Sequence, residues 1–157
     1  MSQQTNDDLT RSGELDADPA PQHAPTTEPS RKVLTIERAK WRRGGDAGGS
    51  SKTLLFNQKD ELMCCLGFDA LACGVPLRYI QNAGDPADIF DLASFPEYVA
   101  SRITDKATDE DDGNRWLTPA VRSAIEHNDD EKIDDDERER LIRADLMLLV
   151  WDDVVFV

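Results

Sequence analysis

The first 30 residues of the chain cannot contribute a hydrophobic core. They contain no aromatic residue, no isoleucine and no valine, and their only leucines are Leu9 and Leu15. Because so little apolar surface cannot offset the entropy lost on ordering, we expect a disordered tail over residues 1–30. The tail is acidic, with six carboxylates against one base. Any core must come from residues 31–157, a length typical of one domain.

The whole chain is strongly acidic, with 32 Asp and Glu against 18 Lys and Arg and a net charge of −14. This sign of charge disfavours direct binding to nucleic acid or anionic lipid, because both are contacted through cations. No apolar run approaches the roughly 20 residues of a membrane span, and residues 1–8 lack the features of a signal peptide. Three cysteines, two of them adjacent, indicate a reducing compartment. We therefore expect a cytoplasmic protein without membrane contact.

The charge is unevenly distributed along the chain. Residues 31–52 carry a net charge of +5, whereas residues 104–157 carry −10. The basic segment could offset the protein's own acidic third or meet an acidic partner. Its glycine-rich end, residues 44–53, resembles a phosphate-binding loop, but it lacks the Gly-Lys-Ser/Thr ending and precedes an expected strand. We interpret it as a flexible loop.

The pattern of apolar residues predicts strands near both ends of the core and helices between them. We expect strands at 33–36 and 154–157, and an antiparallel hairpin formed by 53–56 and 61–64. Helix signals are the Gly74 stop, Pro96, the Thr118-Pro119 start and the carboxylates at 134–136. On the last helix we expect an ion pair between Glu139 and Arg143. The expected fold class is α+β, with a small, mostly antiparallel sheet and helices packed on one face. The expected domain organisation is the tail over 1–30 and one domain over 31–157.

The block Met63-Cys64-Cys65-Leu66-Gly67-Phe68 marks a sharp turn from strand to helix. Gly67 would supply either an unusual backbone angle or a close approach between segments. This block, with Ala70-x-Ala72-Cys73-Gly74 after it, is similar to a group of small uncharacterised proteins of tailed phages and prophages. The resemblance extends to Trp116-Leu117 and Asn128-Asp129. It implies a phage or prophage origin and action in the host cytoplasm, and it carries no known activity.

Cys64 and Cys65 are the most distinctive chemical groups. A thiol at the start of a helix can have a lowered pKa and act as a nucleophile, with His127 as a candidate base. The other interpretation is that these cysteines are small buried core residues. Their spacing to Cys73 does not suit a zinc site, and the acidic runs do not fit a calcium loop. We expect no metal and no cofactor.

Three functional hypotheses follow. The first is a non-enzymatic phage or prophage accessory protein that binds a host or phage protein. A narrower form is a host-defence inhibitor whose acidic face imitates nucleic acid and occupies a basic nucleic-acid-binding host protein; the simpler interpretation of the same charges is a solvated face that keeps the protein soluble. The third hypothesis is a small cysteine-dependent enzyme or redox sensor. The candidate partner-binding residues are Asp109, Glu110, Asp111, Asp112, Asp129, Asp130, Glu131, Asp134, Asp135 and Asp136.

Overall fold

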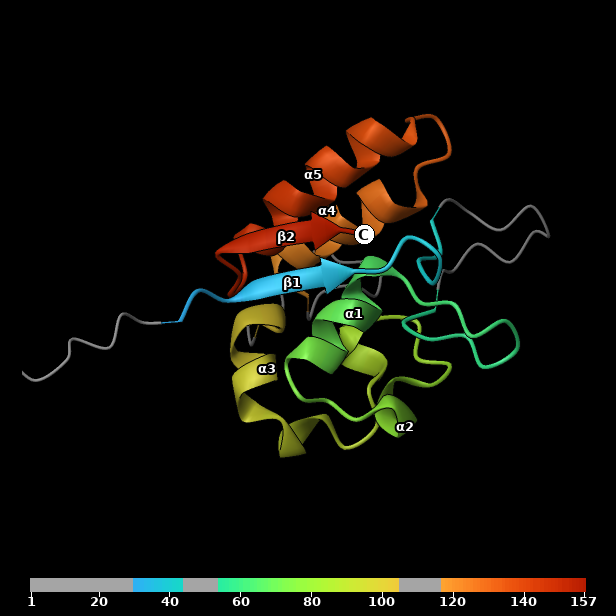
Figure 1. The fold of residues 1–157 in the computed structure, drawn as a ribbon. Helices are drawn as coiled ribbons and strands as arrows, with labels where there is room; N and C mark the ends of the chain where they lie inside the picture. The colour runs from blue at the N-terminus through green and yellow to red at the C-terminus, as the bar shows by residue number, and fades with distance from the viewer. Residues whose placement is uncertain (1–29, 44–53, 105–116) are drawn as a thin grey trace, which may run out of the picture.

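The sheet is formed by the first and last strands. The computed structural model describes residues 30–43, 54–104 and 117–157 (Figure 1). Strand β1 spans Val33–Ile36 and strand β2 spans Asp153–Phe156, so both strands expected at the ends of the core are confirmed. The tail predicted for residues 1–30 lies, up to residue 29, outside the described residues.

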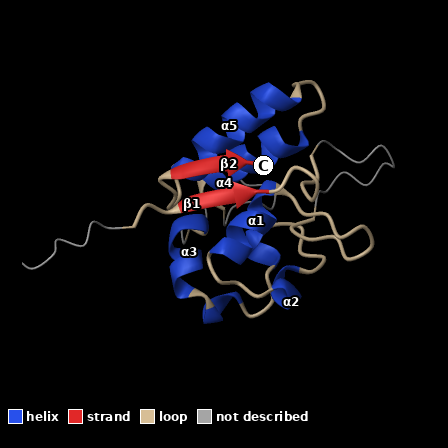
Figure 2. Ribbon diagram, viewed as in Figure 1, coloured by secondary structure: helices blue, strands red, loops and turns tan. Residues whose placement is uncertain are grey.

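Helices account for most of the structure between the two strands (Figure 2). None of those in the described ranges has both the length and the apolar composition that a membrane span needs. The α-helices are α1 (Cys65–Ala72), α2 (Leu77–Ile80), α3 (Pro96–Arg102), α4 (Pro119–Asp129) and α5 (Asp135–Met147), and the short 3-10 helices are η1 (Pro86–Asp88) and η2 (Leu92–Ser94).

The helix boundaries agree with the sequence signals. Gly74 ends α1 with a positive φ of 84°, and Pro96 and Pro119 stand in the first turns of α3 and α4. The side chain of Asp134 accepts a hydrogen bond from the Glu137 amide at 2.9 Å and so caps α5. Thr118 precedes α4 as expected, but its hydroxyl contacts the Ser101 carbonyl at 3.4 Å and does not cap the helix.

The two strands run parallel, so the prediction of a mostly antiparallel sheet is wrong. Of the expected hairpin the structure shows the turn, in which the Asn57 amide donates to the Leu62 carbonyl at 2.8 Å, and one further hydrogen bond, from the Cys64 amide to the Leu54 carbonyl at 3.4 Å. Beyond this turn Phe56 forms a bridge with Gln81, and the two segments do not continue as a ladder. The sheet therefore consists of β1 and β2 alone, and the chain between these two strands contains all the helices. A long connection of this kind allows two strands to pair in parallel.

One face of the sheet is buried. Leu34 lies opposite Val154 and Ile36 lies opposite Phe156, and each of these side chains is at most 8% exposed. The alternate residue Thr35 is exposed. Helix α1 contacts β1 and helix α5 contacts β2. The alternation of apolar residues in the strands therefore matches a sheet with one packed face.

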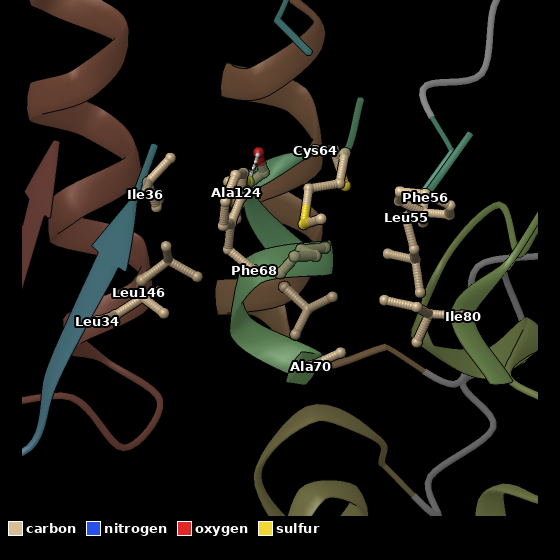
Figure 3. Close-up of a cluster of buried hydrophobic side chains, with 14 of the residues drawn as sticks. Leu34, Ile36, Leu55, Phe56, Cys64, Phe68, Ala70, Ile80, Ala124 and Leu146 are labelled. Atoms are coloured by element: carbon tan, nitrogen blue, oxygen red, sulfur yellow. Dashed lines mark hydrogen bonds between the residues drawn. The ribbon is translucent and has the colours of Figure 1, made fainter. Parts of the chain in front are cut away.

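The core extends from the sheet through α1 to the segment around residue 55. Figure 3 shows Leu34 and Ile36 of β1 beside Leu146 of α5, and Phe68 of α1 between this group and the side chain of Leu55. Helix α1 lies inside the core, and residues on several of its sides are buried. A helix that is apolar around most of its circumference belongs in a core.

Gly67 lies where α1 approaches another segment of backbone. A Cβ atom added at this position would lie 2.0 Å from the carbonyl oxygen of Leu55. The contact is with backbone, so a change of side-chain rotamer cannot relieve it. Of the two roles expected for this glycine, the structure shows the close approach.

We expect Gly67→Ala to destabilise the fold by roughly 3 kcal/mol or more, because α1 and the Leu55 segment must separate. The matched control is Gly74→Ala, whose added Cβ meets no atom within 4 Å. Its effect comes from the positive φ alone and should be about 1–2 kcal/mol. Urea denaturation measures both. Equal unfolding midpoints for the two variants would show that the close approach at Gly67 is not limiting.

Candidate functional site

Cys64 and Cys65 lie inside the core. Cys64 directly precedes α1 and is 5% exposed, while Cys65 is the first residue of the helix and is fully buried. The Cys65 thiol lies 3.7 Å from the carbonyl oxygen of Ala124 in α4. Burial raises the pKa of the Cys65 thiol well above its ordinary value, so desolvation outweighs any lowering by the helix terminus. These surroundings suit a packing residue that keeps its proton at neutral pH.

His127 is paired with a carboxylate. Its Nδ1 atom lies 2.7 Å from a carboxylate oxygen of Asp145 and 3.5 Å from the hydroxyl of Ser123. Both contacts are to the same ring nitrogen. A Ser-His-Asp relay needs the acid and the nucleophile on opposite nitrogens, so this trio lacks the required geometry.

Asn128, next to His127, joins three segments of the fold. Its side-chain oxygen accepts from the Trp41 indole N–H at 2.8 Å and from the Cys65 amide at 3.3 Å, and its amide group donates to the Arg42 carbonyl at 3.3 Å. The side chain of Cys64 does not cap α1. The first amide of α1 is therefore capped by a side chain from α4.

The candidate acidic residues fall into two groups. Asp109, Glu110, Asp111 and Asp112 lie outside the described residues. The other six lie on residues 129–136, which join the end of α4 to the start of α5 and are called the acidic end below. The structure therefore places six of the predicted partner-binding residues on one connection between two helices. They are Asp129, Asp130, Glu131, Asp134, Asp135 and Asp136.

Arg138 holds the backbone of the acidic end. This side chain is almost fully buried, and its guanidinium donates to the carbonyl oxygens of Asp130 at 2.5 Å and Ile133 at 3.1 Å. It also donates to the Asp135 carboxylate at 2.7 Å. The Asp130 carboxylate accepts from the Lys132 amide at 2.8 Å. The loop is thus fixed by hydrogen bonds from within.

Several carboxylates of this region already have partners. Asp134 caps α5, and Asp135 also pairs with Arg43 at 2.9 Å. Glu131 and Asp136 are exposed, and neither forms an ion pair within the described ranges. These two carboxylates are therefore the ones in the acidic end that remain available to a partner.

The basic segment near the N-terminus offsets the protein's own acidic third. Arg38 forms a two-point contact with Glu139 at 2.6 and 2.7 Å, which raises the pKa of Arg38 further above its ordinary range. Arg31 lies 3.2 Å from Asp153. The predicted pairing of Glu139 with Arg143 is wrong, because Glu139 binds Arg38 while Arg143 donates to the Val154 carbonyl.

A buried ion pair was not anticipated from the sequence. Arg102 of α3 binds Asp69 of α1 through two hydrogen bonds of 2.8 and 2.6 Å, and both side chains are completely buried. The Trp151 indole N–H donates to the same carboxylate at 2.7 Å. The only sequence signal was an acid at position 69 within the apolar run 65–72, because a carboxylate in such a run requires a partner.

Cys73 lies beside this ion pair. The Arg102 guanidinium lies 3.1 Å from the Cys73 sulfur. Burial raises the pKa of the Cys73 thiol to about 11. Across the described ranges, no group of three or more His, Cys, Asp and Glu side chains is arranged to hold a metal ion.

Comparisons with known proteins gave no match. The chain matched no protein-family model, no curated protein and no solved structure. The resemblance to small phage and prophage proteins therefore stays a prediction from residues 63–74.

We expect Arg102→Met to destabilise the protein by roughly 3–5 kcal/mol, because it leaves the Asp69 carboxylate buried without its cation. The double variant Asp69→Leu/Arg102→Met should recover at least half of this loss, since neither charge remains. Arg140→Met serves as the control and should have an effect below about 1 kcal/mol, because its pair with Glu137 is exposed on the surface. Chemical denaturation of the four proteins provides the measurement, and a double variant no more stable than Arg102→Met would contradict the interpretation.

The raised pKa of Cys73 predicts a loss of stability in alkali. Below pH 9 the thiol is protonated in both the folded and the unfolded chain, whereas between pH 9 and about 11 only the unfolded chain loses the proton. The free energy of unfolding should therefore fall as the pH rises through this interval. In Cys73→Ala the fall should be smaller, as measured from urea midpoints at pH 7, 9 and 10.5. Equal falls in both proteins would exclude Cys73 as a contributor.

Proposed function

We propose that this protein is a non-enzymatic binding protein and that its acidic end contacts a basic surface on a partner protein. The observation that supports this most is that the guanidinium of Arg138 fixes the backbone of the acidic end by donating hydrogen bonds to two of its carbonyl oxygens. A face that only keeps a protein soluble has no need of fixed positions for its charges. Here Glu131 and Asp136 lie on a loop and a helix turn whose geometry is set by the hydrogen bonds of the largely buried Arg138.

A fixed array of charges favours binding in two ways. The partner does not have to order the loop, so less conformational entropy is lost on association. The net charge of −14 also attracts a cationic partner over a long range and increases the association rate. Both effects depend on charge, and the second weakens as salt is added.

The narrower form of the proposal is nucleic-acid mimicry. In this form the partner is a nucleic-acid-binding host protein, and the acidic end occupies the groove that normally holds phosphates. A role as a phage or prophage accessory protein or host-defence inhibitor acting in the host cytoplasm is part of this proposal and rests on the resemblance of residues 63–74.

The alternative of a cysteine-dependent enzyme or redox sensor has less support. Cys65 is buried with a raised pKa, and His127 is engaged by Asp145. A thiol nucleophile needs a lowered pKa and access for its substrate.

The proposal can be tested with a charge-reversal variant, Glu131→Lys/Asp136→Lys. The immobilised full chain should retain basic nucleic-acid-binding proteins from a bacterial lysate, and duplex DNA or high salt should release them. The variant should lose this retention, because its two available carboxylates become cations. Captured proteins are identified and quantified by mass spectrometry.

The matched control is Glu37→Lys/Glu61→Lys, which changes the net charge equally at two exposed positions on other segments. This control should retain the same proteins, and both variants should melt near the wild-type temperature. If both variants lost retention equally, binding would depend on the net charge of the protein and not on the acidic end. Retention that resists both salt and DNA would contradict an electrostatic contact.

A further inference from the structure

A cavity of about 430 Å³ lies away from the acidic end. It is bordered by the beginning of β1, the end of α1, helix α3 and the residues just before β2, which meet near the label α3 in Figure 1. Its volume falls in the range of 300–1,000 Å³ that is typical of small-molecule sites. The inference drawn from it is independent of the proposed function.

One part of the cavity wall is apolar. It consists of Val33, Ala72, Val150 and the side chain of Trp151. Val33 lies on the solvent-facing side of β1 and is 42% exposed. The indole of Trp151 is held in place, because its N–H donates to Asp69 at 2.7 Å. This wall offers a preformed surface to an aromatic or branched aliphatic group.

Arg102 of the buried ion pair forms another part of the cavity wall. Its guanidinium already donates to Asp69, Cys73, Ser101 and the Tyr98 carbonyl. All of its N–H groups therefore have acceptors, and its charge is matched by that of Asp69. Arg102 is therefore a fixed part of the cavity wall, and the polar group of a ligand must be bound by other residues.

Two polar groups remain for a ligand. The hydroxyl of Tyr98, a wall residue that is 2% exposed, is buried and has no hydrogen-bond partner within the described ranges. Burial raises the pKa of Tyr98, so its hydroxyl stays protonated and can donate. Lys32 lies at the exposed border, and its ammonium forms no ion pair with any described residue. The hydroxyl oxygen has almost no exposed surface, so a ligand reaches it only when the side chains of the cavity wall shift. A buried hydroxyl without a partner is unfavourable, so an acceptor that reaches it is stabilised.

We propose that this cavity binds a small hydrophobic carboxylate. The apolar body of the ligand lies along Val33, Val150 and Trp151, and its carboxylate accepts from the Lys32 ammonium and the Tyr98 hydroxyl. Glu97, which also borders the cavity, disfavours a second negative charge on the ligand. The preferred class is therefore a monoanion with an aromatic or branched aliphatic body.

The test compares two probes of nearly the same shape, phenylacetate and the neutral phenylacetamide. Titration of the full chain, followed by two-dimensional NMR, should show phenylacetate shifting the Trp151 indole N–H and the Ala72 amide. Phenylacetamide should bind more weakly. Lys32→Met and Tyr98→Phe should each weaken phenylacetate binding by roughly threefold or more. Tyr98→Phe should not lower the melting temperature, because the hydroxyl that it removes has no partner.

Three further variants complete the test. Ala72→Phe, which fills the cavity from the exposed end of α1, should abolish binding. Ala144→Phe places the same side chain on an exposed position of α5, and Lys59→Met removes a lysine from a distant turn; both should bind phenylacetate like the wild type. Equal affinity for the two probes would overturn the proposal. So would retention of binding by Ala72→Phe, or shifts confined to residues away from the cavity.

Discussion

The ion pair between Asp69 and Arg102 is the contact on which the arrangement of the helices depends. It joins α1 to α3, and through the indole of Trp151 it also holds the residues that lead into β2. Its contribution to net stability is limited, because both charges lose their hydration on burial. Its larger effect is on geometry, since any shift of α3 along α1 would leave a charge buried without a partner. The same constraint shapes the cavity beside α3.

Positive charges in this acidic protein are used to hold segments together. Arg38 anchors the end of β2 to α5 by donating to Phe156 and Glu139, while Arg138 closes the loop between α4 and α5. Apart from Lys32, the bases of residues 31–43 are paired with the protein's own acids. The surplus of carboxylates therefore determines the charge of most of the surface.

The sequence was informative where the signal was local. Gly74, Pro96 and Asp134 each mark a helix boundary through their own backbone or side-chain chemistry, and these boundaries are confirmed. The partner of each strand was not predictable, because alternation of apolar residues identifies the buried face but not the neighbouring strand. The same holds for the pair of Asp69 with Arg102 and the capping of α1 by Asn128. Both depend on contacts between residues more than 30 positions apart.

The parallel pairing of β1 with β2 also has a consequence for how the chain folds. Val33 and its partner Asp153 are 120 positions apart, and closing a loop of this length loses entropy worth about 4 kcal/mol. Helices α4 and α5 face no such delay, since they are neighbours in sequence and pack against each other. Local helical contacts can therefore form on the way to the transition state, while the strands join late, after the helices have brought the two ends together.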